Sequence, residues 1–233
     1  MDPVRETVSS VLKRRVVKPT EQRRAEILEA ALALFSSKGF HDTTMEEVAN
    51  AAGVAKGTIY LYFQSKEHLL LALKRDFMQG LTDAVANIVA EAIENLEGGK
   101  GMDYRDIIDD IFHAVVDYHT SRRDAVEVVV RQSPSPDLVN EALQLEHDYL
   151  MLVTSAFRTG MEYGLVHTED PEMTAHLITA AIRDNIATCL CYGEPKDLDR
   201  LVEASKQMLY KALAPGIELP LRRPRLVRST PAT

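Results

Sequence analysis

The chain has 233 residues, of which 45% are hydrophobic and 27% are charged, and its formal net charge is −8. This length and composition are ordinary for a globular protein with one large or two modest domains. No stretch is apolar over the roughly 18 residues that a membrane span needs, and the N-terminus lacks the apolar core of a secretory signal. Cys189 and Cys191 are too few for a disulfide framework. We therefore expect a cytoplasmic protein.

The charge is distributed unevenly along the chain. Residues 1–75 hold 12 basic and 9 acidic side chains, residues 76–214 hold 11 and 25, and residues 215–233 hold 4 and 1. The acidic average therefore hides an N-terminal module that tolerates a polyanion and a larger module that repels one. This pattern indicates which end could face phosphates, although it does not by itself establish binding.

Apolar residues recur at helical spacing, and glycine and proline gather at the breaks, so the sequence predicts an all-α fold with nine helices. The expected helices cover residues 21–38, 45–52, 56–64, 66–96, 103–120, 122–132, 136–163, 170–191 and 196–214. Residues 126–132 could form a strand in isolation. They have no obvious partner strand, so we expect a short buried helix there.

Local signals mark several helix ends. Thr20 is the expected N-cap of the first helix, Thr44 and Glu47 have the spacing of a capping box, and Ser65 is the expected cap of the long fourth helix. Gly80 is a candidate site for a kink in that helix.

The same pattern divides the chain into four parts. We expect a flexible basic arm over residues 1–19, a smaller helical module over 20–66, a larger helical module over 67–214, and a disordered tail rich in Pro and Arg over 215–233.

Two short helices with a tight connection at residues 53–55 form the most informative segment. The first carries an apolar stripe made by Met45, Val48, Ala49 and Ala52, and the second carries Ile59 and Phe63, which are four residues apart. Burial of both stripes against the first helix produces a helix-turn-helix. This packing turns Gly57 and Leu61 outward.

The outward face has the side chains of a DNA-reading surface. Gly57 permits close backbone approach, Leu61 can contact a thymine methyl group, and tyrosine and lysine can bind phosphates. The expected DNA-binding residues are Thr44, Lys56, Gly57, Thr58, Tyr60, Leu61, Tyr62 and Lys66. The alternative is a helix-turn-helix that binds nothing, with half-buried tyrosines that serve only packing.

The segment FSSKGFHDTTMEEVANAAGVAKGTIYLYFQSKEHLLLAL resembles the DNA-binding domain of the tetracycline-repressor (TetR) family of bacterial transcriptional regulators. The resemblance covers about 50 residues, Glu21 to Leu71, and rests on Ala30, Phe35, Gly39, Phe40, Thr43, Thr44, Val48, Ala49, Ala52, Gly53, Val54, Gly57, Tyr60, Phe63, Lys66, Leu69 and Leu70. It implies a homodimer that binds a double-stranded DNA operator of (pseudo)palindromic sequence. We therefore expect residues 20–66 to be a helix-turn-helix DNA-binding domain and residues 67–214 to be a ligand-binding and dimerisation domain. The basic run at residues 13–15 is then either a minor-groove arm or a solvated tail. Position 61 departs from the family, because many members carry an aromatic or polar residue there.

The last two expected helices carry apolar seams at spacings of three and four residues. We expect Ile178, Ile182, Asn185, Cys189, Leu201 and Met208 to form a four-helix interface with a second copy, in which Asn185 fixes the register. The alternative is a monomer whose seams pack internally.

The middle helices are expected to enclose a pocket for an unknown small-molecule effector, with Phe112, His119, Arg131, Tyr149 and Phe157 as candidate lining residues. The competing interpretation is that these aromatic residues are ordinary core. No HxxxH or HExxH pair and no nucleotide-binding or nucleophile motif is present. We therefore expect no cofactor, no metal and no catalytic residue, and we interpret the chain as a ligand-responsive repressor. A DNA-bound adaptor for a protein partner, a thiol sensor and an enzyme remain as alternatives.

Overall fold

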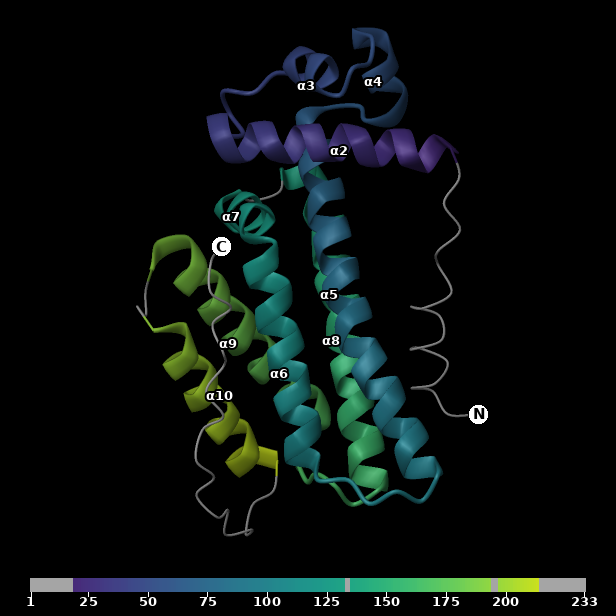
Figure 1. The fold of residues 1–233 in the computed structure, drawn as a ribbon, viewed down its shortest axis with the longest axis vertical. Coiled ribbons are helices and arrows are strands. Elements are labelled where there is room, and N and C mark those ends of the chain that lie inside the picture. Colours follow the sequence, from purple (N-terminus) through teal and green to yellow (C-terminus); the bar gives the residue numbers. More distant parts are fainter. Residues whose placement is uncertain (1–18, 133–134, 194–196, 214–233) are drawn as a thin grey trace, which may run out of the picture.

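The computed structural model describes residues 19–132, 135–193 and 197–213. Within these ranges the protein is all-α, with nine α-helices and one short 3-10 helix (Figure 1). The helices are α2 (Pro19–Lys38), α3 (Met45–Ala51), α4 (Lys56–Tyr62), α5 (Lys66–Glu97), α6 (Tyr104–Ser121), α7 (Arg123–Arg131), η1 (Pro136–Leu138), α8 (Val139–Glu162), α9 (Pro171–Tyr192) and α10 (Leu198–Leu213). The expected basic arm, apart from Pro19, and the expected Pro/Arg-rich tail lie outside the described residues.

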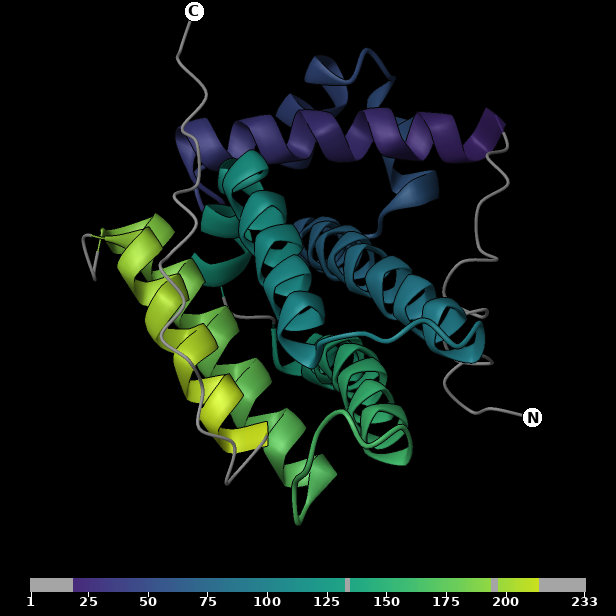
Figure 2. The same ribbon diagram turned by 60° about the horizontal axis from the view of Figure 1, so that its bottom comes forward.

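The helices form two parts of unequal size. Helix α2 lies across one end of α5, with α3 and α4 on its far side (Figure 1). Helices α5, α6 and α8 run along the length of the larger part, and α9 and α10 pack beside α6 and α8, as the turned view shows (Figure 2). None of the helices in the described ranges combines the length and apolar character needed to cross a membrane.

Most helix ends follow the local signals. The capping box at Thr44 and Glu47 is formed, Ser65 caps α5, and Asp170 caps α9 through the backbone N–H of Met173. The expectation for Thr20 is wrong, because α2 begins at Pro19. Proline suits the first position of a helix, where its fixed φ is already helical and its missing N–H would have no partner.

The middle of the chain holds one agreement and one difference. Residues 126–131 are helical, as expected, and α7 buries Val126 and Val128. The single helix expected over 136–163 is instead a 3-10 turn at Pro136–Leu138 followed by α8. Short 3-10 turns are frequent at helix N-termini, and Pro136 again takes the first position.

The core has a main cluster in the larger part and a separate one in the N-terminal part. The N-terminal cluster joins α2, α3 and α4 to the first two turns of α5 through Leu69, Leu70, Ala72 and Leu73, and it includes Val128 of α7. The main cluster of the larger part follows α5 from Phe77 to Ile93 and continues onto α6, α8 and α9. Helices α5 and α7 therefore contribute side chains to both clusters, so a movement of either helix would change the packing in both parts.

Gly80 brings α6 close to α5. Helix α5 continues through this glycine, and a Cβ atom placed there would overlap the Tyr118 side chain of α6. The Tyr118 hydroxyl donates a hydrogen bond to the carbonyl oxygen of Phe77 at 2.9 Å. The glycine proposed from the sequence as a kink site thus provides room for a side chain of the neighbouring helix.

Candidate functional site

Helices α3 and α4 have the orientation that the apolar spacing predicts. Ile59 is 0% exposed and Phe63 is 4% exposed, and both belong to the N-terminal core. On the opposite side of α4, Leu61 is 83% exposed and Gly57 is also exposed. The side of α4 that faces away from α2 is therefore free to contact another molecule.

The turn between the two helices is fixed by its backbone. Gly53 has φ of +65°, a left-handed conformation that favours glycine. The next residue, Val54, donates its N–H to the carbonyl of Ala49 at 2.9 Å and packs against the N-terminal core. These contacts set the angle between α3 and α4, and with it the direction of the exposed face.

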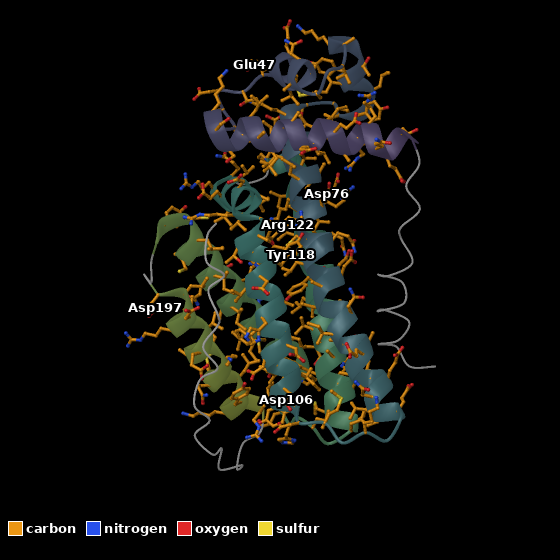
Figure 3. All side chains as sticks on the ribbon, viewed as in Figure 1. Glu47, Asp76, Asp106, Tyr118, Arg122 and Asp197 are labelled. Atoms are coloured by element: carbon orange, nitrogen blue, oxygen red, sulfur yellow. The ribbon has the colours of Figure 1, made fainter. Side chains whose placement is uncertain are left out.

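The start of α3 is held by a small network around Glu47, whose position Figure 3 marks. Its carboxylate accepts a hydrogen bond from the ammonium of Lys38 and from the backbone N–H of Thr44 at 2.9 Å. The Lys38 hydrogen bond, followed by those from Thr44, lowers the pKa of Glu47 to about 2. Thr44 itself is exposed at the N-terminus of α3, where free backbone N–H groups favour anions.

The two lysines near this face differ in exposure and therefore in how readily they can bind another molecule. Lys56 is exposed and forms an ion pair with the equally exposed Glu46 at 2.8 Å, a contact that solvent screens and that another anion can replace. Lys66 is half-buried and donates to the carbonyls of Phe40 at 2.7 Å and His41 at 2.9 Å. Lys66 therefore also stabilises the loop before α3.

The structure brings most of the expected DNA-binding residues onto one surface. Five of them are exposed: Thr44, Lys56, Gly57, Tyr60 and Leu61. Thr58, Tyr62 and Lys66 are partly buried. Tyr62 packs against the N-terminal core and borders a groove of about 250 Å³ that runs toward the larger part.

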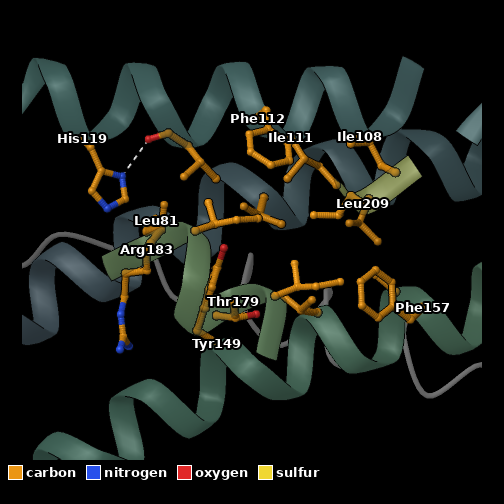
Figure 4. Close-up of a pocket in the computed structure, with 17 residues that line it drawn as sticks. Leu81, Ile108, Ile111, Phe112, His119, Tyr149, Phe157, Thr179, Arg183 and Leu209 are labelled. Carbon is orange, nitrogen blue, oxygen red and sulfur yellow. Dashed lines mark hydrogen bonds between the residues drawn. The ribbon is translucent and has the colours of Figure 1, made fainter. Parts of the chain in front are cut away.

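An apolar pocket of about 80 Å³ lies in the larger part, between α5, α6, α8, α9 and α10. Four of the five expected lining residues border it: Phe112, His119, Tyr149 and Phe157 (Figure 4). Arg131, the fifth, does not border this pocket. At the end of α7 its guanidinium donates to the carbonyl of Cys191 at 3.2 Å and lies over the Tyr192 ring, so it points toward the end of α9.

Few polar groups line this pocket. His119 is buried, and its Nδ1 lies 2.7 Å from the carbonyl oxygen of Val115, which can only accept, so Nδ1 carries the proton. Burial lowers the pKa of His119 and the charge of Arg183 lowers it further, which leaves Nε2 as an acceptor in the neutral ring. Burial also favours the neutral form of Tyr149 and raises its pKa to about 12. The Tyr149 hydroxyl points into the pocket (Figure 4).

Arg183 is the charged residue of the pocket that the sequence analysis missed. It lies on α9 between Ile182 and Asp184, lines the pocket, and pairs with Glu146 of α8 at 3.2 Å. The sequence feature that could have indicated Arg183 is its position as the one arginine in the otherwise largely apolar α9. Its depth could not be inferred, because the spacing alone does not say which side of α9 faces the interior.

The expected dimer seam requires correction on α9. Ile178 and Cys189 are buried within the subunit, and Ile182 packs in the same core and lines the pocket. Ile178 and Ile182 pack with residues of α6 and α10 in the core of the subunit, so these two side chains do not form an exposed seam. Asn185 and Met208 are exposed, and Leu201 is half-buried. The large exposed apolar side chains on these helices are Met173, Leu177, Tyr192 and Met208.

The remaining candidate chemistry is limited in the described residues. They contain no group of three or more His, Cys, Asp or Glu side chains arranged to hold a metal ion. Cys189 and Cys191 are buried and form no disulfide bond. Burial raises the pKa of the Cys191 thiol, which lowers its fraction of reactive thiolate.

The connection between the two parts is polar at its surface (Figure 3). Arg24 of α2 approaches Asp76 of α5 at 3.7 Å. Burial raises the pKa of Asp76, although the charge of Arg24 opposes the shift. The guanidinium of Arg122 lies 4.9 Å from the centre of the Tyr118 ring.

Comparison with known proteins agrees with this geometry. Residues 27–73 match the family model described as bacterial regulatory proteins, tetR family. The chain is 37% identical over 87 residues to the HTH-type transcriptional repressor KstR2 of Mycobacterium tuberculosis, a match that covers 36% of this chain and 44% of KstR2. It is 24% identical over 201 residues to the fatty acid metabolism regulator protein of Bacillus subtilis, covering 84% and 98%.

Solved structures show that the similarity of fold extends over most of the chain. The fatty acid degradation regulator FadR from Bacillus halodurans superposes with a TM-score of 0.68 at 23% identity, covering 84% of this chain and 96% of that one. FadR from Bacillus subtilis, solved in complex with stearoyl-CoA, gives 0.66 at 20%, covering 80% and 97%.

The fold and the exposed face of α4 define a helix-turn-helix protein with a separate helical domain. The N-terminal domain is similar to that of the tetR family of bacterial regulatory proteins over residues 27–73, and the fold of the chain is that of the FadR regulators.

Proposed function

We propose that this protein is a transcriptional repressor, not an enzyme, that binds a palindromic or pseudopalindromic DNA operator as a homodimer and is released by a small molecule. The observation that carries the proposal is the exposed side of α4, where Leu61 is 83% exposed two residues after the fully buried Ile59. A large apolar side chain that an ordered helix holds in solvent suits contact with a thymine methyl group.

In this proposal α4 enters the major groove. Gly57 and Leu61 face the bases, with Thr58 and Tyr60 beside them and Lys56 exchanging Glu46 for a phosphate. Thr44 presents the N-terminus of α3 to the backbone. The partly buried Tyr62 and Lys66 are proposed as phosphate contacts at the edge of the surface.

The proposed dimer uses the outer side of α9 and α10. Exposed side chains recur there at helical spacing, with Leu177, Asn185 and Tyr192 on α9 and Met208 on α10. Leu201 lies on the same side of α10 and is half-buried. Two copies would place their α4 helices in successive major grooves, about 34–36 Å apart, and double the few phosphate contacts of one domain.

The proposed effector site is the apolar pocket bordered by Phe112, His119, Tyr149 and Phe157. Its volume of about 80 Å³ is about half that of an engineered cavity of about 150 Å³ that binds benzene. A larger molecule must therefore separate the surrounding helices. Because α5 and α7 also pack in the N-terminal core, this separation is a route by which a ligand favours a conformer with different spacing of α4.

Gel-shift titrations against the DNA upstream of the protein's own gene test the proposal. We expect retardation that weakens steeply with salt, requires both halves of the palindrome and is lost in Tyr60→Ala. Retardation that ignores the sequence of the DNA, or that survives in Tyr60→Ala, would contradict it. Circular dichroism of the variant separates loss of contact from loss of fold.

A further inference from the structure

A second cavity adjoins the apolar pocket. This outer cleft, of about 370 Å³, is bordered by α5, α6, α7, α8 and α9, and it shares His119 and Arg183 with the inner pocket. The two cavities differ in chemistry. The inner pocket is lined almost entirely by apolar side chains, whereas the outer cleft also holds Lys74, Glu146 and Asp184. A molecule that spans both would need one apolar end and one polar end.

The charges in the outer cleft converge on one carboxylate. Glu146 of α8 accepts a hydrogen bond from Lys74 of α5 at 2.9 Å and pairs with Arg183 of α9 at 3.2 Å. Burial alone would raise the pKa of Glu146, but these two cations hold it below its usual range. Asp184 contacts Arg183 from the solvent side. Glu146 therefore marks a position in the outer cleft, next to Arg183, where two cations stabilise an anion.

We infer that the effector is an amphipathic anion whose apolar chain enters the inner pocket and whose head group binds Arg183 in place of Glu146. The inference rests on the proposed function, because it names the class of ligand for that same pocket. Arg183 suits the exchange, since it borders both cavities and its planar guanidinium can bind a carboxylate or a phosphate through two parallel hydrogen bonds.

The exchange has a consequence for DNA binding. The Lys74–Glu146–Arg183 cluster joins α5, α8 and α9, and Lys74 follows Leu73, the last α5 residue of the N-terminal core. A ligand that takes over Arg183 frees Glu146 and so weakens one link between α8 and α9. The remaining Lys74–Glu146 pair can then move with α5, the helix that enters the N-terminal domain.

Isothermal titration calorimetry with the full-length chain tests the ligand class. The probes are dodecanoate, dodecanoyl-coenzyme A, dodecan-1-ol and free coenzyme A. The alcohol has the apolar chain without the charge, and free coenzyme A has the charge without the chain. Comparison of dodecanoate with dodecanoyl-coenzyme A distinguishes a free carboxylate from a phosphate-bearing conjugate. We expect at least one of the two anionic chain compounds to bind about tenfold or more tightly than the alcohol, and free coenzyme A to bind more weakly than any compound with a chain.

Two substitutions tie the preference to the cluster. Arg183→Gln should lower the affinity for the preferred anion to that for dodecan-1-ol and leave the alcohol unchanged. Glu146→Gln removes the competing anion and should raise the affinity for the preferred compound about threefold to tenfold. Glu141→Gln is the matched control, because Glu141 pairs with Arg75 at 3.3 Å between the same two helices, α8 and α5, but borders neither cavity. It should leave all affinities unchanged.

Three outcomes would overturn the inference: dodecan-1-ol binding as tightly as both anions, an anion preference that survives Arg183→Gln, or a Glu146→Gln variant no different from Glu141→Gln. Thermal melts of each variant identify a failure to fold, and Glu146→Gln keeps the test informative if Arg183→Gln does not fold. These binding measurements need no DNA. A chain that binds anions selectively and never retards an operator would refute the proposed function while the ligand class stands.

Discussion

The spacing of apolar residues predicts the exposed side of a helix well in the N-terminal domain and poorly in the larger helical domain. In the N-terminal domain, α3 and α4 are each seven residues long and have one apolar stripe, so burial of that stripe determines the exposed face. In the larger domain, α9 is 22 residues long and apolar on more than one side. Spacing alone then leaves open which side faces the interior.

The largest expected effect uses two neighbours on α9 to sharpen this comparison. Ile178 is 8% exposed and Leu177 is 61% exposed. We expect Ile178→Asp to destabilise the fold by several kcal/mol, because it places a carboxylate in an apolar interior. Leu177→Asp should leave helicity and melting temperature nearly unchanged and convert dimers to monomers in analytical ultracentrifugation. If the Ile178→Asp variant were monomeric and melted normally, Ile178 would lie in the dimer interface, as the sequence predicted.

The second pair makes the same contrast within α4. Ile59→Ala should lower the free energy of unfolding by about 2–5 kcal/mol, since it leaves a cavity under the helix. Leu61→Ala should change that free energy by less than about 0.5 kcal/mol and still weaken operator binding. Urea unfolding and gel-shift titration measure the two effects. A stability loss at Leu61 as large as that at Ile59 would mean that α4 is rotated from the orientation described.

These pairs show where prediction from sequence succeeds in this chain. The helix-turn-helix, its capping box and four of the five expected pocket residues followed from short-range spacing. Ile178 and Cys189 are buried where an exposed seam was expected, and Arg131 lies away from the pocket, because the packing of α9 against α6, α8 and α7 decides which way these side chains point. Arg183 was missed for the same reason: its neighbours in space, Glu146 and His119, are distant in sequence.

The third pair compares two glycines. A Cβ atom at Gly80 would overlap Tyr118, whereas nothing lies within 4 Å of one at Gly57. We expect Gly80→Ala to destabilise the protein by about 1–3 kcal/mol through overpacking between α5 and α6. Gly57→Ala should keep or slightly raise stability, because alanine favours a helix, and should weaken DNA binding. Adding Tyr118→Phe to Gly80→Ala should recover part of the loss, and no recovery would place the strain elsewhere.

The smallest expected effect is a pH dependence from the larger domain. Burial lowers the pKa of His119 below its ordinary value of 6.5, so the folded state favours the neutral ring. Below about pH 6.5 the unfolded chain takes up a proton that the folded chain does not, and the free energy of unfolding falls as pH decreases. Above that pH neither state binds the proton, and the contribution is constant.

His113 is the matched control for this effect. It lies on the same helix, and its Nδ1 likewise contacts the carbonyl four residues earlier, that of Asp109 at 2.7 Å, but its ring is exposed. Urea unfolding between pH 7 and about pH 5 should therefore show a shallower pH dependence in His119→Leu and an unchanged one in His113→Leu. Equal slopes in the wild type and both variants would mean that the ring of His119 is solvated, and the pocket it borders would then be open to water.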